Sequence, residues 1–192
     1  MARPREYVRD EVLEQAMQLF WRKGYKAASV TEIVQATGLN TASMYKEFGD
    51  KDGLFEEALA YYRANKVGPR LQMLRDQPTL RGVEAVLGSV ATGAAEGDYK
   101  GCLMMNHLAQ IHTISPKAAV LIETFCADLE ALIAAALRNA QASGEIPAGK
   151  SPEDLASFLV CWIHGVVLYG RHGHGKRRIP RIYHVLLGAL RG

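Results

Sequence analysis

Apolar residues recur three and four positions apart along almost the whole chain, which is the spacing of an α-helix with one buried face. Val12, Ala16 and Leu19 lie in one such stripe near the N-terminus. Leu155 and Leu159 lie in another near the C-terminus. No segment of useful length alternates apolar and polar residues with the period of two that a half-buried strand shows. The sequence therefore predicts an all-α fold.

Size and composition indicate a folded protein of the cell interior. The chain has 192 residues, of which 48% are hydrophobic and 22% are charged, enough for one domain or two tightly joined ones. Its 3 cysteines make no disulfide framework and favour a reducing compartment. The mixed-charge segment Met1–Glu6 contains no apolar signal core, and no apolar run approaches the roughly 20 residues of a membrane helix. We therefore expect a cytoplasmic protein that does not interact with a membrane.

Capping residues and a glycine place two short helices close together in the first 50 residues. Ser29 and Glu32 have the spacing of a capping box, in which each side chain accepts a hydrogen bond from the other residue's backbone N–H. Gly38 has the backbone freedom that a tight left-handed turn requires. Asn40 then stands where it caps a second short helix over Thr41–Phe48. The pattern predicts a helix, a turn and a helix.

Glycine and proline divide the rest of the chain into further helices. Gly68-Pro69 should bend or break the helix that precedes it. We expect a short apolar helix from Cys102 to about His112 and a long helix that Pro116 opens. A loop rich in glycine and histidine is predicted over Gly170–Lys176.

Two short helices joined by a tight turn form a helix-turn-helix, a motif that places its second helix in the major groove of DNA. The second helix here offers Thr41, Ala42 and Ser43, which are small enough to let the helix approach base edges. Tyr45 and Lys46 follow within reach of phosphates. The pattern therefore predicts DNA binding, although three ordinary core helices would show the same periodicity.

Lys51 stands in the first turn of the following helix, where the helix macrodipole disfavours a cation. A phosphate bound at that helix end would be held by the backbone N–H groups and by Lys51 together. We therefore expect Lys51 to contact the DNA backbone.

The stretch from Val12 to Leu59, about a quarter of the chain, resembles the N-terminal domain of TetR-family transcriptional regulators. The residues that carry the resemblance are Ala16, Leu19, Phe20, Gly24, Tyr25, Ser29, Val30, Ile33, Gly38, Leu39, Met44, Tyr45, Phe48, Lys51, Leu54 and Phe55. The resemblance implies a homodimeric repressor whose subunit joins three DNA-binding helices to a larger helical domain. It implies a DNA-binding domain in residues 1–50 and a ligand-binding and dimerisation domain in residues 51–192, with a connecting helix from about residue 51.

Carried over by position, the resemblance implies that Ser29 and Thr31 contact phosphate or flanking bases. The complete candidate set for DNA binding is Ser29, Thr31, Asn40, Thr41, Ala42, Ser43, Tyr45, Lys46 and Lys51. Two positions depart from the family's usual pattern: Thr41 stands where many members have a basic residue, and Glu47 where many have an aromatic one. Glu47 should repel phosphate unless it points away or pairs with a cation, for which Lys46 and Lys51 are the candidates.

One reading helix makes few base contacts, so we expect a homodimer that holds two such helices about 34–36 Å apart on a double-stranded DNA operator. The last two predicted helices could pair with their copies as a four-helix bundle. The candidate interface residues are Phe158, Trp162, Val166, Ile182, Val185, Leu186 and Leu190. The same stripes would also suit the core of one subunit, and the pattern alone does not decide between these two uses.

A small-molecule effector among the central helices would release the DNA by favouring another spacing of the two reading helices. Methionine and aromatic side chains make adaptable apolar walls, and histidine adds a polar group. The candidate ligand-binding residues are Cys102, Met105, His112, Phe125, Phe158, Trp162 and His164. Core positions would show the same residue types at the same spacing.

Two other functions are compatible with the sequence. Cys102 begins a predicted helix beside Lys100, a setting that lowers a thiol pKa, so a regulator that senses electrophiles or oxidants is one alternative. A helical protein-binding adaptor without DNA binding is the other. The sequence contains no nucleophile elbow and no carboxylate pair at catalytic spacing. We expect no enzyme activity, no catalytic residue, no metal site and no cofactor.

Overall fold

The computed structural model describes residues 7–173 and 175–191, and all regular structure within them is helical. The all-α prediction is therefore confirmed. The elements are α1 (Arg9–Lys23), α2 (Val30–Thr37), α3 (Thr41–Phe48), α4 (Lys51–Tyr62), a π-helical segment (Arg63–Val67), α5 (Gly68–Asp76), α6 (Leu80–Ala95), α7 (Leu103–Leu108), a 3-10 turn (Ile111–Thr113), α8 (Pro116–Ala142), α9 (Pro152–Arg171) and α10 (Gly175–Arg191).

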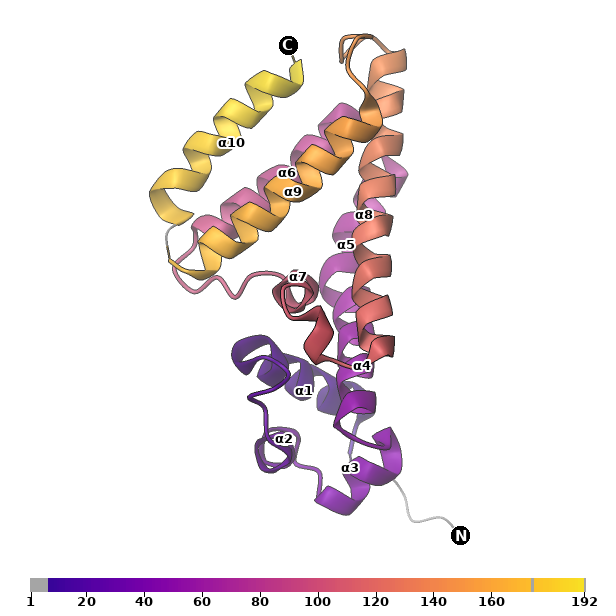
Figure 1. Cartoon of the computed structure of the whole chain (residues 1–192), viewed down its shortest axis with the longest axis vertical. Helices are drawn as coiled ribbons and strands as arrows, with labels where there is room; N and C mark the ends of the chain where they lie inside the picture. The colour runs from indigo at the N-terminus through magenta and orange to yellow at the C-terminus, as the bar shows by residue number, and fades with distance from the viewer. Residues whose placement is uncertain (1–6, 174, 192) are drawn as a thin grey trace.

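The N-terminal helices make one end of the molecule, and the other helices extend away from them (Figure 1). α1, α2 and α3 gather at the end drawn lowest, and α4 leads from them to the remaining helices. α4 packs against α1 with one part of its surface and against α8 with another. α6 and α9 pack against each other and against both α8 and α10.

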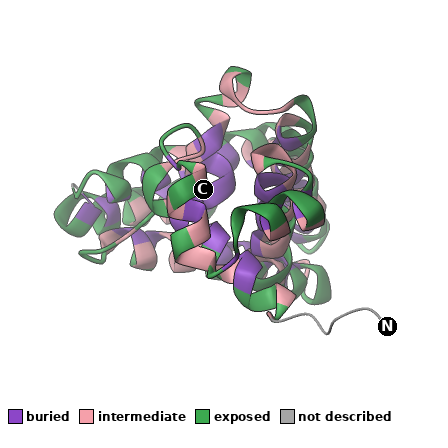
Figure 2. Cartoon of the chain, turned by 90° about the horizontal axis from the view of Figure 1, so that it is seen from below, coloured by how far each residue is buried: buried purple, intermediate pink, exposed green. Residues whose placement is uncertain are grey.

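One apolar core runs through both predicted domains. It contains Val12 and Phe20 from α1, Leu59 from α4 and Leu190 from the end of α10. Seen along the long axis, buried positions face inward between the helices and exposed positions lie outside (Figure 2). The predicted division between residues 50 and 51 therefore falls inside a continuous core, at the start of α4.

Hydrogen bonds confirm the helix boundaries predicted around the first turn. Ser29 Oγ accepts from the Glu32 N–H at 3.3 Å, and the Glu32 carboxylate accepts from the Ser29 N–H at 3.1 Å. Gly38 ends α2 with φ 70°, in the left-handed region. Asn40 Oδ1 accepts from the Ser43 N–H at 2.8 Å and so caps α3. The caps and the left-handed glycine therefore set where α2 ends and where α3 begins.

The break predicted at Gly68-Pro69 coincides with a change of helix type. The π-helical segment separates α4 from α5, and α5 starts at Gly68. Proline has no N–H to donate, so the hydrogen-bond ladder of α4 cannot continue through it unchanged.

The helix predicted from Cys102 to about His112 is shorter than expected. It ends at Leu108, and a separate 3-10 turn follows. The Thr113 hydroxyl donates to the Gln110 carbonyl at 2.8 Å, which satisfies a backbone group outside an α-helical ladder.

The loop predicted over Gly170–Lys176 is also wrong in extent, because α9 continues to Arg171 and α10 starts at Gly175. His174, inside that predicted loop, lies outside the described residues. A Cβ atom added at Gly170 would lie 2.7 Å from the Ala94 Cβ, and one added at Gly175 would lie 1.9 Å from the Ala94 carbonyl oxygen. These glycines therefore allow α9 and α10 to approach α6 closely and do not mark a loop.

Among the described helices, α9 alone is long and apolar enough to cross a membrane, with 20 residues and a mean hydropathy of 1.2. The same composition suits a core helix. α9 packs against α6, α8 and α10 and buries seven of its residues, from Ala156 to Gly170, inside the subunit.

Candidate nucleic-acid interface and ligand pocket

Two buried residues anchor α3, and its other face is open to solvent. Met44 and Phe48 are buried in the core. Thr41 and Ala42 are exposed at the N-terminal end of the helix, and Ser43 is half-buried. Small side chains therefore occupy the exposed edge, as a helix that enters the major groove requires.

The other residues predicted on α2 and α3 lie exposed at the same end of the molecule. Tyr45 is 47% exposed, and Lys46 beside it is also exposed. Ser29 and Thr31 are exposed at the start of α2, and Asn40 is exposed in the turn. All five residues lie on or beside α2 and α3, the lowest helices of Figure 1.

Lys51 is held against an aromatic ring. Its Nζ lies 4.4 Å from the centre of the Tyr25 ring, and burial lowers the pKa of Lys51 while Asp52 opposes that shift. The N-terminus of α4 is already capped, because Asp50 Oδ1 accepts from the Gly53 N–H at 2.8 Å. One N–H of this helix end is therefore already taken, and a phosphate bound there would lie close to the Asp50 carboxylate as well as to Lys51.

Glu47 pairs with a residue that the sequence did not suggest. Arg9 Nη1 lies 3.4 Å from Glu47 Oε2, so neither of the predicted lysine partners is needed to neutralise the carboxylate. The same guanidinium contacts Glu57 and lies 4.8 Å over the Phe48 ring. A separation of 38 residues along the chain leaves no local signal for this pair.

A pocket of about 380 Å³ lies beside α7, and three predicted ligand residues line it: Cys102, Met105 and Phe125. We call it the α7 pocket. Its complete lining is Trp21, Tyr62, Lys66, Val67, Arg70, Leu71, Val86, Val90, Glu96, Asp98, Tyr99, Lys100, Gly101, Cys102, Met105, Phe125, Leu129, Ile163 and Val167. The sequence did not indicate Trp21, which comes from α1 and contributes a buried indole N–H without a hydrogen-bond partner among the described residues.

The other four residues predicted to bind ligand do not line the α7 pocket, so the prediction is wrong for these four at this pocket. His112 is exposed on the 3-10 turn, and Phe158 is 52% exposed on α9. The Trp162 ring packs against Tyr183, with their centres 6.0 Å apart. His164 is half-buried on α9, and burial lowers its pKa. Helical spacing predicts which residues share one face of a helix. It does not predict which of these faces lines a cavity.

Cys102 does not have the surroundings of a reactive thiol. Burial raises the pKa of Cys102, and the nearby Tyr62 hydroxyl opposes this shift only in part. The cation expected to lower the thiol pKa is engaged elsewhere: Lys100 Nζ is 2.9 Å from Gln18 Oε1 and 5.6 Å from the centre of the Trp21 ring. The premise for a sensor at this cysteine is therefore wrong.

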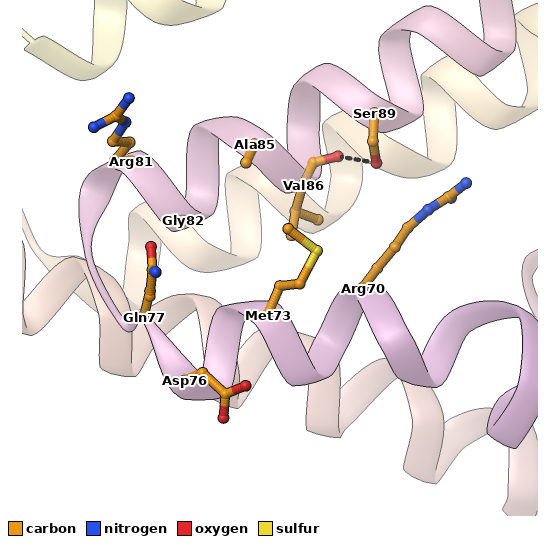
Figure 3. A pocket seen from close by; sticks show the side chains of 9 residues that line it. All are labelled: Arg70, Met73, Asp76, Gln77, Arg81, Gly82, Ala85, Val86 and Ser89. Carbon is orange, nitrogen blue, oxygen red and sulfur yellow. Dashed lines mark hydrogen bonds between the residues drawn. The ribbon is translucent and has the colours of Figure 1, made fainter.

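A second pocket, of about 350 Å³, lies between α5 and α6 (Figure 3). It shares Arg70 and Val86 with the α7 pocket. Arg70 and Arg81 extend toward opposite ends of it and do not converge on one point. The two arginine side chains therefore do not form a shared binding site for one charged group of a ligand.

Three of the predicted interface residues lie outside the core. Val185 is 70% exposed, and Phe158 and Ile182 are also exposed. Leu168 and Tyr169 on α9 add to the exposed apolar side chains of these two helices. Trp162 is half-buried.

The other three predicted interface residues, Val166, Leu186 and Leu190, are buried within the subunit and are removed from the candidate interface. They belong to the inner faces of α9 and α10, which pack against the other helices. Within the described residues, no three metal-ligating side chains come together.

Comparison with known proteins agrees with this architecture over nearly the whole chain. Residues 12–58 match the family described as "Bacterial regulatory proteins, tetR family", and residues 79–184 match "Tetracyclin repressor-like, C-terminal domain". The HTH-type transcriptional repressor ComR of Escherichia coli K12 is 31% identical over 94% of this chain and 87% of its own length. The repressor BdcR of the same organism is 34% identical over 60% of this chain and 58% of its own length.

Solved structures show the same fold. The regulator CifR, in a cysteine mutant complexed with 26-bp double-strand operator DNA, superposes with a TM-score of 0.84 and 28% identity, covering 98% of this chain and all of that one. The reduced form of E. coli NemR has a TM-score of 0.82 at 16% identity and covers 94% of this chain and 95% of its own. The chain therefore belongs to the TetR family of transcriptional regulators.

Proposed function

We propose that the chain is a repressor that binds an inverted-repeat DNA operator as a homodimer and leaves it when a small molecule occupies the α7 pocket. The observation that carries the proposal is the exposed N-terminal edge of α3, where Thr41 and Ala42 face solvent. Residues 1–50 would read the DNA, and residues 51–192 would bind the effector and the second subunit.

Two kinds of DNA contact follow from the exposed groups. Thr41, Ala42 and Ser43 would meet base edges, where hydroxyls donate or accept and a methyl group touches thymine. Phosphates would be held by the surrounding residues, namely Ser29, Thr31, Asn40, Tyr45, Lys46 and Lys51. Phosphate contacts fix the register of the helix, and base contacts select the sequence.

The exposed apolar side chains of α9 and α10 support a homodimer. Phe158 and Leu168 on α9 and Ile182 and Val185 on α10 would leave a large apolar surface in water on a single subunit. Pairing of the two helices with their copies in a four-helix bundle would cover that surface. The same contact would set the distance between the two α3 helices.

The lining of the α7 pocket indicates the chemistry of its effector. Met105 and Phe125 supply adaptable apolar walls, and the volume of about 380 Å³ suits a small organic molecule. These walls favour an effector with a largely apolar body.

The two alternative functions are less well supported. The raised pKa of Cys102 disfavours sensing through its thiol. An adaptor without DNA binding would leave the exposed edge of α3 and the family membership unexplained. Repression needs no catalytic step, and a regulator of this kind acts where the DNA is, in the cytoplasm.

Selection of bound sequences from a pool of random duplexes tests the proposal. We expect an inverted repeat whose half-sites are about 10 bp apart, or a multiple of that, because each subunit reads one major groove. Recovery of a single half-site would contradict the dimer, and no enrichment would contradict DNA reading.

A pair of matched variants makes the selection specific to α3. Ala42→Asp places a carboxylate on the reading edge and should abolish enrichment. Ala131→Asp places the same charge at an exposed alanine on α8 and should leave the selected sequence unchanged. Loss of enrichment in both variants would point to a general effect of negative charge.

A further inference from the structure

α7 contacts the α7 pocket on one side and, on the other, α4 and the segment between α1 and α2. Met105 on this helix lines the pocket, and His107, two residues later, lies on the opposite side. His107 is 3% exposed, and the centre of its ring lies 4.9 Å from that of Phe55 on α4. The short helix α7 therefore carries Met105, which would touch the effector, and His107, which touches residues of the DNA-binding end.

Both ring nitrogens of His107 are committed to hydrogen bonds. Nδ1 is 2.9 Å from the Leu103 carbonyl oxygen, so Nδ1 carries the proton and donates. Nε2 is then the acceptor for the backbone N–H of Tyr25, at 3.1 Å. This hydrogen bond joins residues that are 82 positions apart in the sequence, and it links α7 to the segment between α1 and α2.

Tyr25 extends the connection to the start of α4. Its hydroxyl donates to the Asp52 carboxylate, and Lys51 Nζ lies over its ring. Lys51 and Asp52 are in the first turn of α4, directly after the reading helix α3. A shift of His107 would therefore reach the residue that we expect to contact the DNA backbone.

We propose that occupancy of the α7 pocket is transmitted to the DNA-reading helices through the hydrogen bond between the Tyr25 N–H and His107. His107 is a positioning residue in this scheme, since it lines neither the pocket nor the DNA-reading edge. The inference rests on the proposed function, because it assumes that the pocket controls DNA binding. The rival routes are α4, since Tyr62 at its end lines the same pocket, and α1, since Trp21 lines it as well.

A double-mutant cycle on operator affinity separates the His107 route from the two rival routes. Leu129→Trp, on α8 and not on α7, extends an indole into the pocket and stands in for an effector. The duplex recovered by selection serves as the operator. We expect Leu129→Trp to weaken operator binding about tenfold in the native background and less than about twofold in a His107→Phe background. A His107→Gln background keeps an acceptor oxygen and should restore most of the native effect.

Each other outcome has a definite meaning. Equal weakening by Leu129→Trp in the native and His107→Phe backgrounds would overturn the His107 route and leave the proposed pocket intact. No weakening in the native background, with DNA binding preserved, would contradict the proposed pocket and the inference together.

A spectroscopic measurement covers the case in which His107→Phe fails to fold. In ¹⁵N-labelled protein with native His107, Nδ1 should be protonated and Nε2 bare. Leu129→Trp should shift the amide resonance of Tyr25, because the acceptor of that N–H moves. An unshifted Tyr25 amide in a folded Leu129→Trp protein would overturn the inference without any DNA measurement.

Discussion

The Arg9 guanidinium lies 3.4 Å from the carboxylate of Glu47, the only acidic side chain of α3. An acidic group beside a phosphate would weaken DNA binding, and this ion pair neutralises it before DNA arrives. Both side chains are partly buried, so the pair is screened less than one at the open surface.

Replacement of Arg9 should therefore impair DNA binding through Glu47. We expect Arg9→Met to weaken operator binding by about two- to fivefold, which corresponds to about 0.4–1 kcal/mol, the upper part of the range for exposed ion pairs. Fluorescence anisotropy with a labelled duplex measures the effect. Glu47→Gln added to Arg9→Met should restore binding, whereas Glu57→Gln, which removes the other partner of Arg9, should not.

Lys46 and Thr41 should differ in what they contribute to the DNA complex. Lys46→Gln should weaken binding to all sequences and lower the slope of log affinity against log salt by about 1, because one phosphate contact is lost. Thr41→Ala should change the preferred base at one position, by about 1–3 kcal/mol, and keep the salt slope. Titrations at several salt concentrations check both, and a change in salt slope for Thr41→Ala would place that residue on phosphate instead.

Local signals account for what the sequence predicted well. The capping box of Ser29 and Glu32, the left-handed Gly38 and the cap at Asn40 each act within three or four residues. A pattern of that range specifies two helices and the turn between them without knowledge of the rest of the chain. The bounds and caps of α2 and α3 were therefore predictable from the local sequence.

Long-range relationships account for what the sequence could not predict. The Arg9 and Glu47 pair and the contact of Tyr25 with His107 join segments far apart in sequence, and no periodicity encodes them. A stripe on an amphipathic helix also does not say what buries it. Leu186 therefore lies in the core, while Val185 beside it is exposed.

Burial of neutral His107 should make folding stability depend on pH. Burial, with a smaller contribution from Arg171, lowers the pKa of His107 below the value of about 6.5 in an unfolded chain. Between these two pKa values the unfolded chain binds a proton that the folded chain does not. The free energy of unfolding contributed by this group is thus fully present above the unfolded pKa and falls as the pH falls through that window.

Urea unfolding at about pH 7.5 and about pH 5.5 measures this dependence. His107→Gln removes the titrating group, so the variant should lose less stability on acidification than the native chain. His164 also has a lowered pKa from burial and contributes in the same direction, which is why the difference between native chain and variant is the relevant quantity. Equal losses would show that His107 takes up its proton in the folded state as readily as in the unfolded one.

The half-buried thiol of Cys102 should react slowly with alkylating reagents. Because burial raises its pKa, little thiolate is present near neutral pH, and alkylation by iodoacetamide should be slow in the folded protein. Mass spectrometry after trypsin digestion measures the modified fraction, and the urea-unfolded chain provides the fully reactive control. Rapid modification of folded Cys102 with loss of operator binding would revive the sensor hypothesis.

The exposed face of α9 and α10 offers the clearest test of assembly. Val185 is 70% exposed on α10, and Val120 is 58% exposed on α8, outside the candidate interface. A carboxylate at the centre of a dimer contact would be buried without a partner, at a cost of several kcal/mol, whereas a carboxylate at an open surface costs little. We expect Val185→Asp to be monomeric in sedimentation velocity and to bind the operator about 100-fold more weakly, because a single α3 helix then reads the DNA. Val120→Asp, a matched substitution of similar exposure, should stay dimeric with native affinity. A dimeric Val185→Asp protein that retains operator binding would move the interface away from α10.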